Sequence, residues 1–230
     1  MSLTVIRSAE GLRRALAPHR DARKLIGLVP TMGALHDGHL SLVHRASRDC
    51  GIVVASLFVN PTQFGENEDF DAYPRDESRE LSLLDEYGVD FVYAPSVDEM
   101  YPDGFKITIT VQGVTEGLCG AARPGHFDGV TTVVSKLFAD CKPDAAYFGQ
   151  KDYQQMKVIE RMVSDLDLNI RIVGLPVVRE RDGLALSSRN AYLSAAHRRV
   201  APSMFGTMRA VAERLHSGID LDAQSEWGQS

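Results

Sequence analysis

Short apolar segments separated by stretches of helical periodicity are the feature that most limits how this chain can fold. The apolar segments cover residues 25–30, 52–59, 91–94, 144–149 and 170–178. Helices are expected between them, over residues 39–50, 76–87, 128–141 and 151–165. Strands that alternate with helices form a parallel sheet covered on both faces. The sequence therefore predicts an α/β fold, a Rossmann-like parallel sheet with helices on both faces.

The character of the sequence changes after Val178. We place a first domain at residues 1–177 and a second, smaller domain at 178–230. In the second domain, Asp182 and Gly183 predict a tight turn, and 194–217 reads as one long helix. The tail from residue 219 shows no further strand. In the first domain, the alternating segment KITITV at 106–111 is expected to form an edge strand.

Composition excludes several classes of protein. The formal net charge is −6 without a basic run, which argues against a nucleic-acid partner. The widely spaced Cys50, Cys119 and Cys141 form no CxxC pair, so we expect reduced thiols and neither a disulfide framework nor a zinc site. The sequence shows no membrane-spanning apolar run and no signal-peptide pattern, so a soluble, cytoplasmic protein is expected.

The segment PTMGALHDGHL at 30–40 is the first that indicates chemistry. It follows a predicted strand and precedes a helix, where ligands bind in such sheets. The glycines permit a tight turn, and His36 and His39 would share one face of the first helical turn. Helix entrances favour anions, so two imidazoles there suit the phosphates of a nucleotide. Two surface histidines, or a metal pair that lacks a third ligand, are the alternatives.

The segment FGQKDYQQ at 148–155 occupies the corresponding place after a later strand. Lys151 is expected to open a helix, where the helix dipole would prefer an acid. Such a local conflict indicates function, with Lys151 reaching a phosphate and Asp152 holding a ribose hydroxyl or a metal ion. A solvated, charged helix start is the alternative.

The loop at 57–76, LFVNPTQFGENEDFDAYPRD, carries Asn60 and Gln63. Both side chains are uncharged and offer hydrogen-bond donors and acceptors, which suits a substrate with hydroxyls and a carboxylate. A polar loop built on Asx turns explains the same residues without a ligand.

The segment CGAARPGHFDGV at 119–130 carries Arg123 and His126 just before a predicted helix. They form a second basic pair at a helix entrance. The alternative is a structural turn in which Asp128 caps the helix.

In LALSSRNAYLS, residues 184–194, adjacent serines and an arginine follow the tight turn. Ser187, Ser188 and Arg189 can donate hydrogen bonds to a triphosphate. A simple helix cap is the alternative.

Taken in order, these five segments resemble those of the pantothenate synthetase (pantoate–β-alanine ligase) family, and the match runs from about Thr4 to Ser194. In this resemblance, HDGH stands where the adenylyl-transferring superfamily has its HIGH signature, and SSR stands where it has its KMSKS loop.

The resemblance implies a two-step reaction. ATP and pantoate would give pantoyl-adenylate and pyrophosphate, and the amine of β-alanine would then displace AMP to give pantothenate, a precursor of coenzyme A. It implies His39 as the proton donor, with His36 and Lys151 as further catalytic groups, Gln63 at pantoate and β-alanine, and Gln155 at pantoate. The implied ATP-binding residues are Met32, Gly33, Ala34, Leu35, His36, Asp37, Gly38, His39, Gly149, Gln150, Lys151, Asp152, Val178, Leu186, Ser187, Ser188 and Arg189.

Further implications are Mg²⁺ bound with ATP, with no protein ligands assigned, and a homodimer. Arg123 and His126 match positions that line the site, without a definite role. Only residues 179–230 follow Val178, so the lid domain of the family is expected here in reduced or truncated form. Two other functions stay open, a nucleotidyltransferase of the same superfamily and a nucleotide-binding module without catalysis. A tRNA-linked role is disfavoured by the acidic charge.

Overall fold

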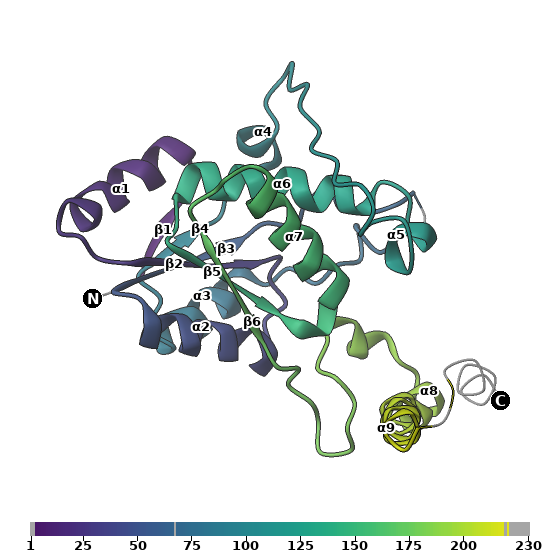
Figure 1. The fold of residues 1–230 in the computed structure, drawn as a ribbon. Helices are drawn as coiled ribbons and strands as arrows, with labels where there is room; N and C mark the ends of the chain where they lie inside the picture. Colours follow the sequence, from purple (N-terminus) through teal and green to yellow (C-terminus); the bar gives the residue numbers. More distant parts are fainter. Residues whose placement is uncertain (1–2, 67, 219, 221–230) are drawn as a thin grey trace. The chain divides into compact units, whose positions relative to one another are not determined.

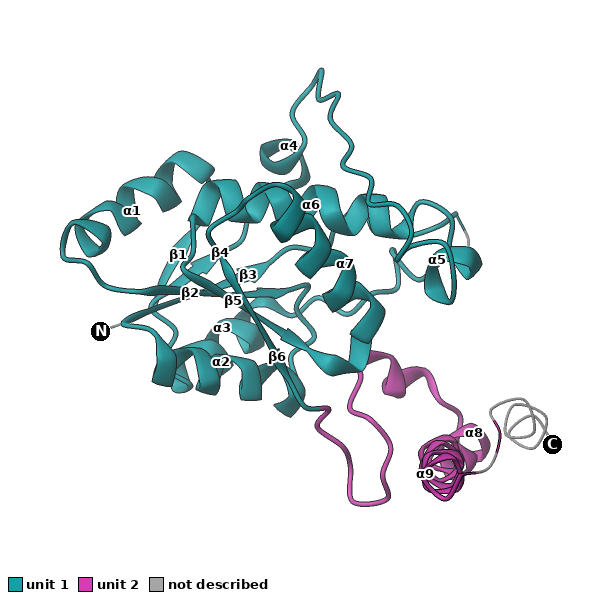
Figure 2. Cartoon of the chain, viewed as in Figure 1, with its two compact units in different colours: residues 1–176 teal, residues 177–230 magenta. Residues whose placement is uncertain are grey.

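The structure, a computed structural model, describes residues 3–66, 68–218 and 220. The chain divides into two compact units, residues 1–176 and 177–230 (Figure 2). The tail for which the sequence predicts no strand lies, apart from Asp220, outside the described residues.

Unit 1 is built on a six-stranded parallel sheet (Figure 1). All five strands predicted for the parallel sheet are present, which confirms the Rossmann-like α/β fold. The edge strand β1 (Thr4–Ile6), which pairs with β4 (Phe91–Tyr93), was not predicted, because only Ile6 of its three residues is buried. The strands are β1 (Thr4–Ile6), β2 (Ile26–Thr31), β3 (Ile52–Leu57), β4 (Phe91–Tyr93), β5 (Ala145–Gly149) and β6 (Arg171–Leu175), in the order β1-β4-β3-β2-β5-β6.

Helices cover both faces of the sheet, and each face has its own apolar core (Figure 1). One core includes α1 (Ala9–Asp21), α6 (His126–Cys141) and α7 (Tyr153–Asp165). The other includes α2 (Asp37–Asp49) and α3 (Glu77–Glu86). Helix α1 was not predicted, because it buries only Leu12 and Leu16 in an otherwise polar stretch.

The predicted edge strand at 106–111 is wrong. Side chains of α6 take the place of a strand partner there. The Ile109 N–H donates to Thr132 Oγ1 at 3.0 Å, and the Ile109 carbonyl accepts from the Thr131 hydroxyl. Hydroxyls at two successive helix positions thus satisfy the backbone that an edge strand would leave open.

The single helix predicted over 194–217 is also wrong. Unit 2 contains two helices there, α8 (Ala195–Val200) and α9 (Ser203–His216). The break falls at Pro202, whose missing N–H and fixed φ end a helix that arrives from its N-terminal side. A third helical segment, η3 (Ser188–Tyr192), precedes them.

The order of the strands determines where a ligand can bind. From β2, the chain continues through β3 and β4 on one side, and β5 and β6 lie on the other side. The carboxyl ends of β2 and β5 are therefore neighbours at a topological switch point, where open parallel sheets bind their ligands. None of the helices in the described part of the chain is long and apolar enough to cross a membrane.

Gly129 lets α6 approach η1 (Pro61–Gln63) closely. A Cβ atom at Gly129 would lie 2.3 Å from the Thr62 carbonyl oxygen and 2.7 Å from the Gln63 nitrogen. Both neighbours are backbone atoms, so neither can turn aside as a flexible side chain would. The loop that carries Gln63 therefore needs a glycine at this position of α6.

We expect Gly129→Ala to lower the free energy of unfolding by about 1–3 kcal/mol, because the new methyl group must push apart a packed helix and loop. Gly206→Ala in α9 is the matched control, since a Cβ there would meet nothing within 4 Å. That control should be neutral or stabilising by about 0.5–1 kcal/mol. Denaturant unfolding followed by circular dichroism measures both. Equal stability of the two variants would contradict the packing argument.

Candidate active site

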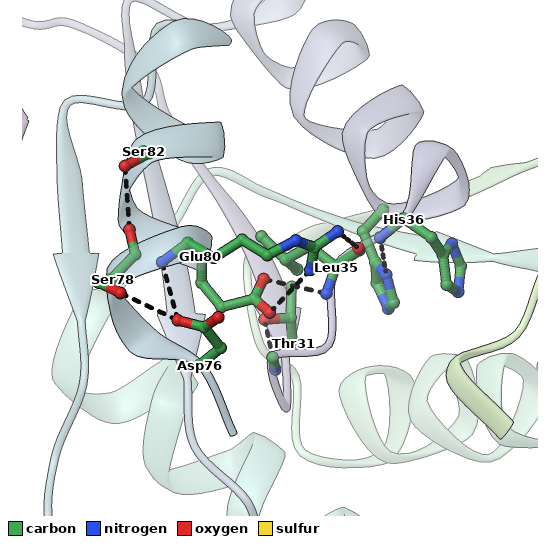
Figure 3. Close-up of polar contacts among 10 residues, drawn as sticks. Thr31, Leu35, His36, Asp76, Ser78, Glu80 and Ser82 are labelled. Atoms are coloured by element: carbon green, nitrogen blue, oxygen red, sulfur yellow. Dashed lines mark hydrogen bonds and ion pairs between the residues drawn. The ribbon is translucent and has the colours of Figure 1, made fainter. Parts of the chain in front are cut away.

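The turn after β2 is held in a strained conformation (Figure 3). Gly33 has φ 85° and Ala34 has φ 49°, so two successive residues are left-handed. This conformation costs a non-glycine residue such as Ala34 about 1 kcal/mol or more. Thr31 holds the start of the turn, because its hydroxyl donates to the Ser56 carbonyl at 2.7 Å and accepts from the Gly33 N–H at 3.2 Å.

The strained turn leads into a histidine pair at the start of α2. His36 is the N-cap of the helix, and its Nδ1 accepts from the Gly38 N–H at 3.1 Å. Nδ1 of His39 accepts from the His36 N–H at 3.4 Å, and the two ring centroids are 4.2 Å apart. Because each Nδ1 is an acceptor, each neutral ring carries its proton on Nε2. The pair therefore has two Nε2–H donors available at the helix entrance.

Both imidazoles are neutral at pH 7. Burial lowers the pKa of His39 to about 3, and the charges of His36 and Lys151 act in the same direction. Burial and the charge of Lys151 also lower the pKa of His36. Before a ligand binds, the pair can therefore interact with anions as neutral hydrogen-bond donors and not as imidazolium cations.

Lys151 lies near this pair, since its charge acts on both imidazoles. It belongs to η2 (Gln150–Asp152), a short 3-10 turn between β5 and α7. The prediction that Lys151 opens the helix is therefore wrong, because α7 begins at Tyr153. Its Nζ lies 3.2 Å from Oδ1 of the exposed Asp152. The structure thus brings the segments after β2 and β5 together, as the switch point requires.

Gln63, at the end of η1, is oriented by a buried asparagine. Asn60 is 1% exposed, and its amide donates to Oε1 of Gln63 at 3.1 Å and to the Gly129 carbonyl at 3.1 Å. The Gln63 amide in turn lies 3.0 Å from the sulfur of Met32, in the turn after β2. Asn60 therefore has a structural role, as the alternative of a polar loop built on Asx turns predicts. The structure places the side chain of Gln63 beside the turn that holds the histidine pair.

Arg123 and His126 connect to the same loop. Arg123 holds Glu68 through Nε at 2.6 Å and donates from Nη1 to Nε2 of His126, 3.0 Å away. Since an arginine can only donate, His126 accepts at Nε2 and carries its proton on Nδ1, which donates to the Gln63 carbonyl at 2.8 Å. Burial and the Arg123 charge lower the pKa of His126, so the ring stays neutral. This chain of contacts fixes the backbone of Gln63.

The alternative in which Asp128 caps α6 is wrong. The N-cap is Gly125, which is left-handed with φ 79°, and Asp128 lies in the first turn of the helix. A left-handed N-cap without a side-chain bond leaves the first N–H groups of α6 without a capping side chain.

The two neighbouring glutamines of α7 differ in their contacts. The Gln154 amide donates to the carbonyls of Val114 and Gly117 at 3.0 and 2.8 Å, and its oxygen accepts from the Cys119 N–H at 3.0 Å. Gln154 therefore pins a surface loop. Gln155 is half-buried, and within the part of the chain that the structure describes its side chain has no hydrogen-bond partner. Of the two, Gln155 is the one free to bind a ligand.

Two of the remaining predicted ATP contacts, Val178 and Leu186, lie on a hairpin within unit 2. The Val178 carbonyl accepts from the Leu186 N–H at 3.0 Å, and Arg179 pairs with Ala185 in an antiparallel bridge. The predicted tight turn is confirmed by Gly183, which has φ 95°.

The serines and the arginine follow this hairpin directly. The Ser187 hydroxyl accepts from the Arg189 N–H at 3.3 Å and caps η3, which begins at Ser188. A capping role is therefore present at Ser187, and contact of this segment with a triphosphate stays a prediction.

Sequence reasoning missed two acidic residues. Glu68 binds Arg123, and the buried Glu80 of α3 accepts from the Leu35 N–H in the strained turn (Figure 3). Glu68 lies in the loop at 57–76 and Glu80 in an amphipathic helix, and a single acid in either place reads as a solvated charge. Among residues 3–66, 68–218 and 220, no three His, Cys, Asp or Glu side chains gather as metal ligands would.

Comparisons with known proteins agree on one family. The family model described as pantoate-beta-alanine ligase matches residues 4–229. A pantothenate synthetase of Rhodospirillum rubrum is 55% identical over 227 residues, which are 99% of this chain and 80% of that protein. The pantothenate synthetase of Acetivibrio thermocellus is 52% identical over 222 residues, which are 96% and 79% of the two chains.

Solved structures give the same result. The crystal structure of pantothenate synthetase from Thermus thermophilus has a TM-score of 0.93 and 49% identity, covering 98% of this chain and 80% of that one. A pantoate-beta-alanine ligase from Francisella tularensis, complexed with beta-gamma ATP and beta-alanine, has a TM-score of 0.84 and 36% identity, covering 90% and 80%.

The neutral histidines predict how stability depends on pH. The unfolded chain protonates His39 around its ordinary value of 6.5, whereas the folded chain does so at about 3. Between these values the unfolded state binds more protons, so stability is lost as the pH falls. For one such group the slope is at most about 1.4 kcal/mol per pH unit.

We expect denaturant unfolding at pH 7, 6 and 5 to show this decline, and His39→Asn to reduce its slope. The measurements stop at pH 5, because below this pH the protonation of carboxylates also changes the free energy of unfolding. His36 and His126 shift in the same direction and should keep part of the slope in the variant. Identical slopes in the two proteins would show that His39 titrates alike in the folded and unfolded chains.

Proposed function

Because this chain belongs to the pantoate–β-alanine ligase family, we propose that it uses ATP to condense pantoate with β-alanine through a pantoyl-adenylate, releasing AMP and pyrophosphate. The product would be pantothenate, a precursor of coenzyme A. The observation that carries the proposal is the convergence of the His36–His39 donors, Lys151 and Gln63 at the switch point of the sheet.

In the first step, the carboxylate of pantoate attacks the α-phosphorus of ATP, and the bond to the β-phosphate breaks. Negative charge develops on the leaving pyrophosphate. The Nε2–H groups of His36 and His39 and the N-terminus of α2 donate toward phosphate oxygens, and Lys151 supplies a full positive charge. Fixed donors of this kind stabilise the charge of the transition state more than that of bound ATP.

The predicted role of His39 as proton donor takes a specific form. With a pKa of about 3 in the unliganded protein, His39 begins the reaction as a neutral hydrogen-bond donor. Nearby phosphate charge raises the pKa of an imidazole, because it favours the protonated form. His39 therefore becomes more basic as ATP binds.

In the second step, the amine of β-alanine attacks the adenylate carbonyl, and AMP leaves. In this proposal, Gln63 and Gln155 hold the pantoyl group through their uncharged amides, and Gln63 also contacts β-alanine. Holding two reactants together in this way can contribute about 7–11 kcal/mol to the step. The chain from Glu68 to the Gln63 carbonyl supplies the rigidity that such positioning needs.

We assign unit 2 the role of a lid. In this proposal, residues 1–177 bind nucleotide and pantoate, and residues 178–230 supply further contacts to ATP. The backbone of Val178 contacts adenine, and Leu186 to Arg189 contact the phosphates. The remaining ATP contacts are those predicted from the turn at 32–39 and from Gly149 to Asp152. Closure of such a segment excludes water from a reactive adenylate.

Mg²⁺ would accompany ATP and neutralise phosphate charge. Asp152 is an exposed carboxylate that already pairs with Lys151. Mg²⁺ usually keeps several waters and binds through substrate phosphates, so ATP itself would supply most of its ligands. A homodimer and a cytoplasmic location follow from the resemblance to the family, and the three free cysteines suit a reducing compartment.

Pyrophosphate exchange tests the proposed reaction. With ATP, Mg²⁺ and pantoate, labelled pyrophosphate should enter ATP in the absence of β-alanine, because adenylate formation is reversible. Net release of AMP should require β-alanine, since its amine consumes the adenylate.

Exchange that does not depend on pantoate would contradict the adenylate mechanism. A nucleotidylated product in place of AMP would identify the superfamily's nucleotidyltransferase chemistry instead. Binding of ATP without exchange or turnover would indicate a nucleotide-binding module.

The two glutamines of α7 provide a matched pair of variants. Gln155→Ala should raise the KM for pantoate about 10-fold or more, because one uncharged hydrogen bond to the substrate is lost, while thermal stability and the KM for ATP stay unchanged. Gln154→Ala should lower the melting temperature, since it releases the loop at 114–119. An unchanged pantoate KM in Gln155→Ala would remove that residue from the substrate site.

A further inference from the structure

The strained turn after β2 needs a partner on its far side. Thr31 fixes the chain only before the left-handed residues Gly33 and Ala34. The left-handed conformation is unfavourable for Ala34, so the turn would relax if nothing held the chain after it. Any relaxation would move His36, the residue after Leu35, and with it the reciprocal cap that orients both imidazoles.

Glu80 supplies the missing hold (Figure 3). Its Oε2 accepts from the Leu35 N–H at 2.9 Å, across 45 residues of sequence. Arg79 completes a clamp, with Nη1 3.5 Å from Oε1 of Glu80 and Nη2 donating to the Leu35 carbonyl at 3.5 Å. Both backbone groups of Leu35 are thus held by two adjacent residues of α3.

The helix that carries the clamp is itself fixed at its start. Asp76 caps α3 by accepting from the Arg79 N–H at 3.1 Å, and it also accepts from the Ser78 hydroxyl at 2.9 Å. The first turn of α3 therefore has a defined position, and the Glu80 carboxylate needs no rearrangement to reach Leu35.

Glu80 is not suited to touch a ligand. Its side chain is 3% exposed, and its two oxygens face Leu35 and Arg79. A carboxylate also repels phosphates, so on charge alone an apolar residue would serve an anion site better. The contact with the Leu35 N–H is what Glu80 provides, and a buried charge is tolerated when it is paired and hydrogen-bonded.

We propose that Glu80 is a positioning residue that holds the left-handed turn 33–34 and so fixes the two histidine donors that receive the phosphates of ATP. The ATP part of this inference rests on the proposed function. Glu80 acts through Leu35 and His36, so its removal should weaken the use of ATP specifically and leave the pantoate contacts at Gln63 and Gln155 in place.

The test compares four variants in the pyrophosphate exchange assay. Glu80→Ala removes the clamp, and Glu80→Gln keeps an oxygen that can accept from Leu35. Ser82→Ala, on the same helix, is the matched control, because the exposed Ser82 hydroxyl contacts only the Ser78 carbonyl within the described chain. The double variant Ala34→Gly/Glu80→Ala removes the strain together with the clamp, since glycine adopts the left-handed conformation freely.

Glu80→Ala should raise the KM for ATP about 10- to 100-fold, because a small displacement of catalytic donors has a large effect. The KM for pantoate should change little, and Glu80→Gln and Ser82→Ala should resemble the unmodified protein. Ala34→Gly should restore part of the ATP affinity in the Glu80→Ala background. Should Glu80→Ala fail to fold, Glu80→Asp, which shortens the reach to Leu35 by one methylene, should show the same selective rise.

An unchanged KM for ATP in Glu80→Ala would overturn the proposal. So would equal losses for ATP and pantoate without rescue by Ala34→Gly, which would mean that Glu80 merely supports the fold.

Amide hydrogen exchange separates this inference from the proposed function. In the protein without ligands, the Leu35 amide should be protected, and Glu80→Ala should lose that protection while Ser82→Ala keeps it. This measurement involves no substrate, so it holds even if the exchange assay shows a different reaction. A Leu35 amide that exchanges freely in the unmodified protein would refute the clamp directly.

Discussion

The pairing of β2 with β5 is the contact on which the rest of unit 1 depends. It joins Gly27 to Ala145 and Leu28 to Ala146, across more than half of the chain. A larger residue at Gly27 would press on Cys50 and on Tyr147, whose atoms lie 3.0 and 3.1 Å from a Cβ at this position. Because the strands are parallel, their carboxyl ends lie side by side. The turn after β2, which leads to the two histidines, meets η2, which carries Lys151, only because these two strands are neighbours.

Three groups are proposed to act on ATP: His36, His39 and Lys151. Their environment keeps the two imidazoles uncharged in the protein without ATP. Burial and the Lys151 ammonium together hold His36 and His39 neutral, so two dipolar donors lie near the Lys151–Asp152 ion pair. Other side chains position a group that would touch the substrates. Asn60 orients the side chain of Gln63, and His126 fixes its backbone. Precision in this site comes from the surrounding polar contacts as much as from the groups that would touch ATP.

Strands buried on both faces leave continuous apolar runs, which is why the sequence predicts the central sheet well. The sequence also places His36, His39 and Lys151 after strands, since ligand sites in parallel sheets follow a simple rule. It misses what depends on contacts between distant residues. Glu80 resembles any solvated acid of an amphipathic helix until its 45-residue reach to Leu35 is seen. Nor can spacing reveal a histidine tautomer, which is set by whichever backbone group the ring nitrogen meets.

The reciprocal cap of His36 and His39 also has a kinetic meaning. An imidazole in water exchanges between two tautomers and turns about its side-chain bonds, so an incoming anion usually has to wait for a productive arrangement. Here both Nδ1 atoms are already engaged by backbone N–H groups. In the proposed function, no proton has to migrate and no ring has to flip when ATP binds at this pair. The two imidazoles are thus oriented before any ligand binds, because their reorganisation was completed when the chain folded.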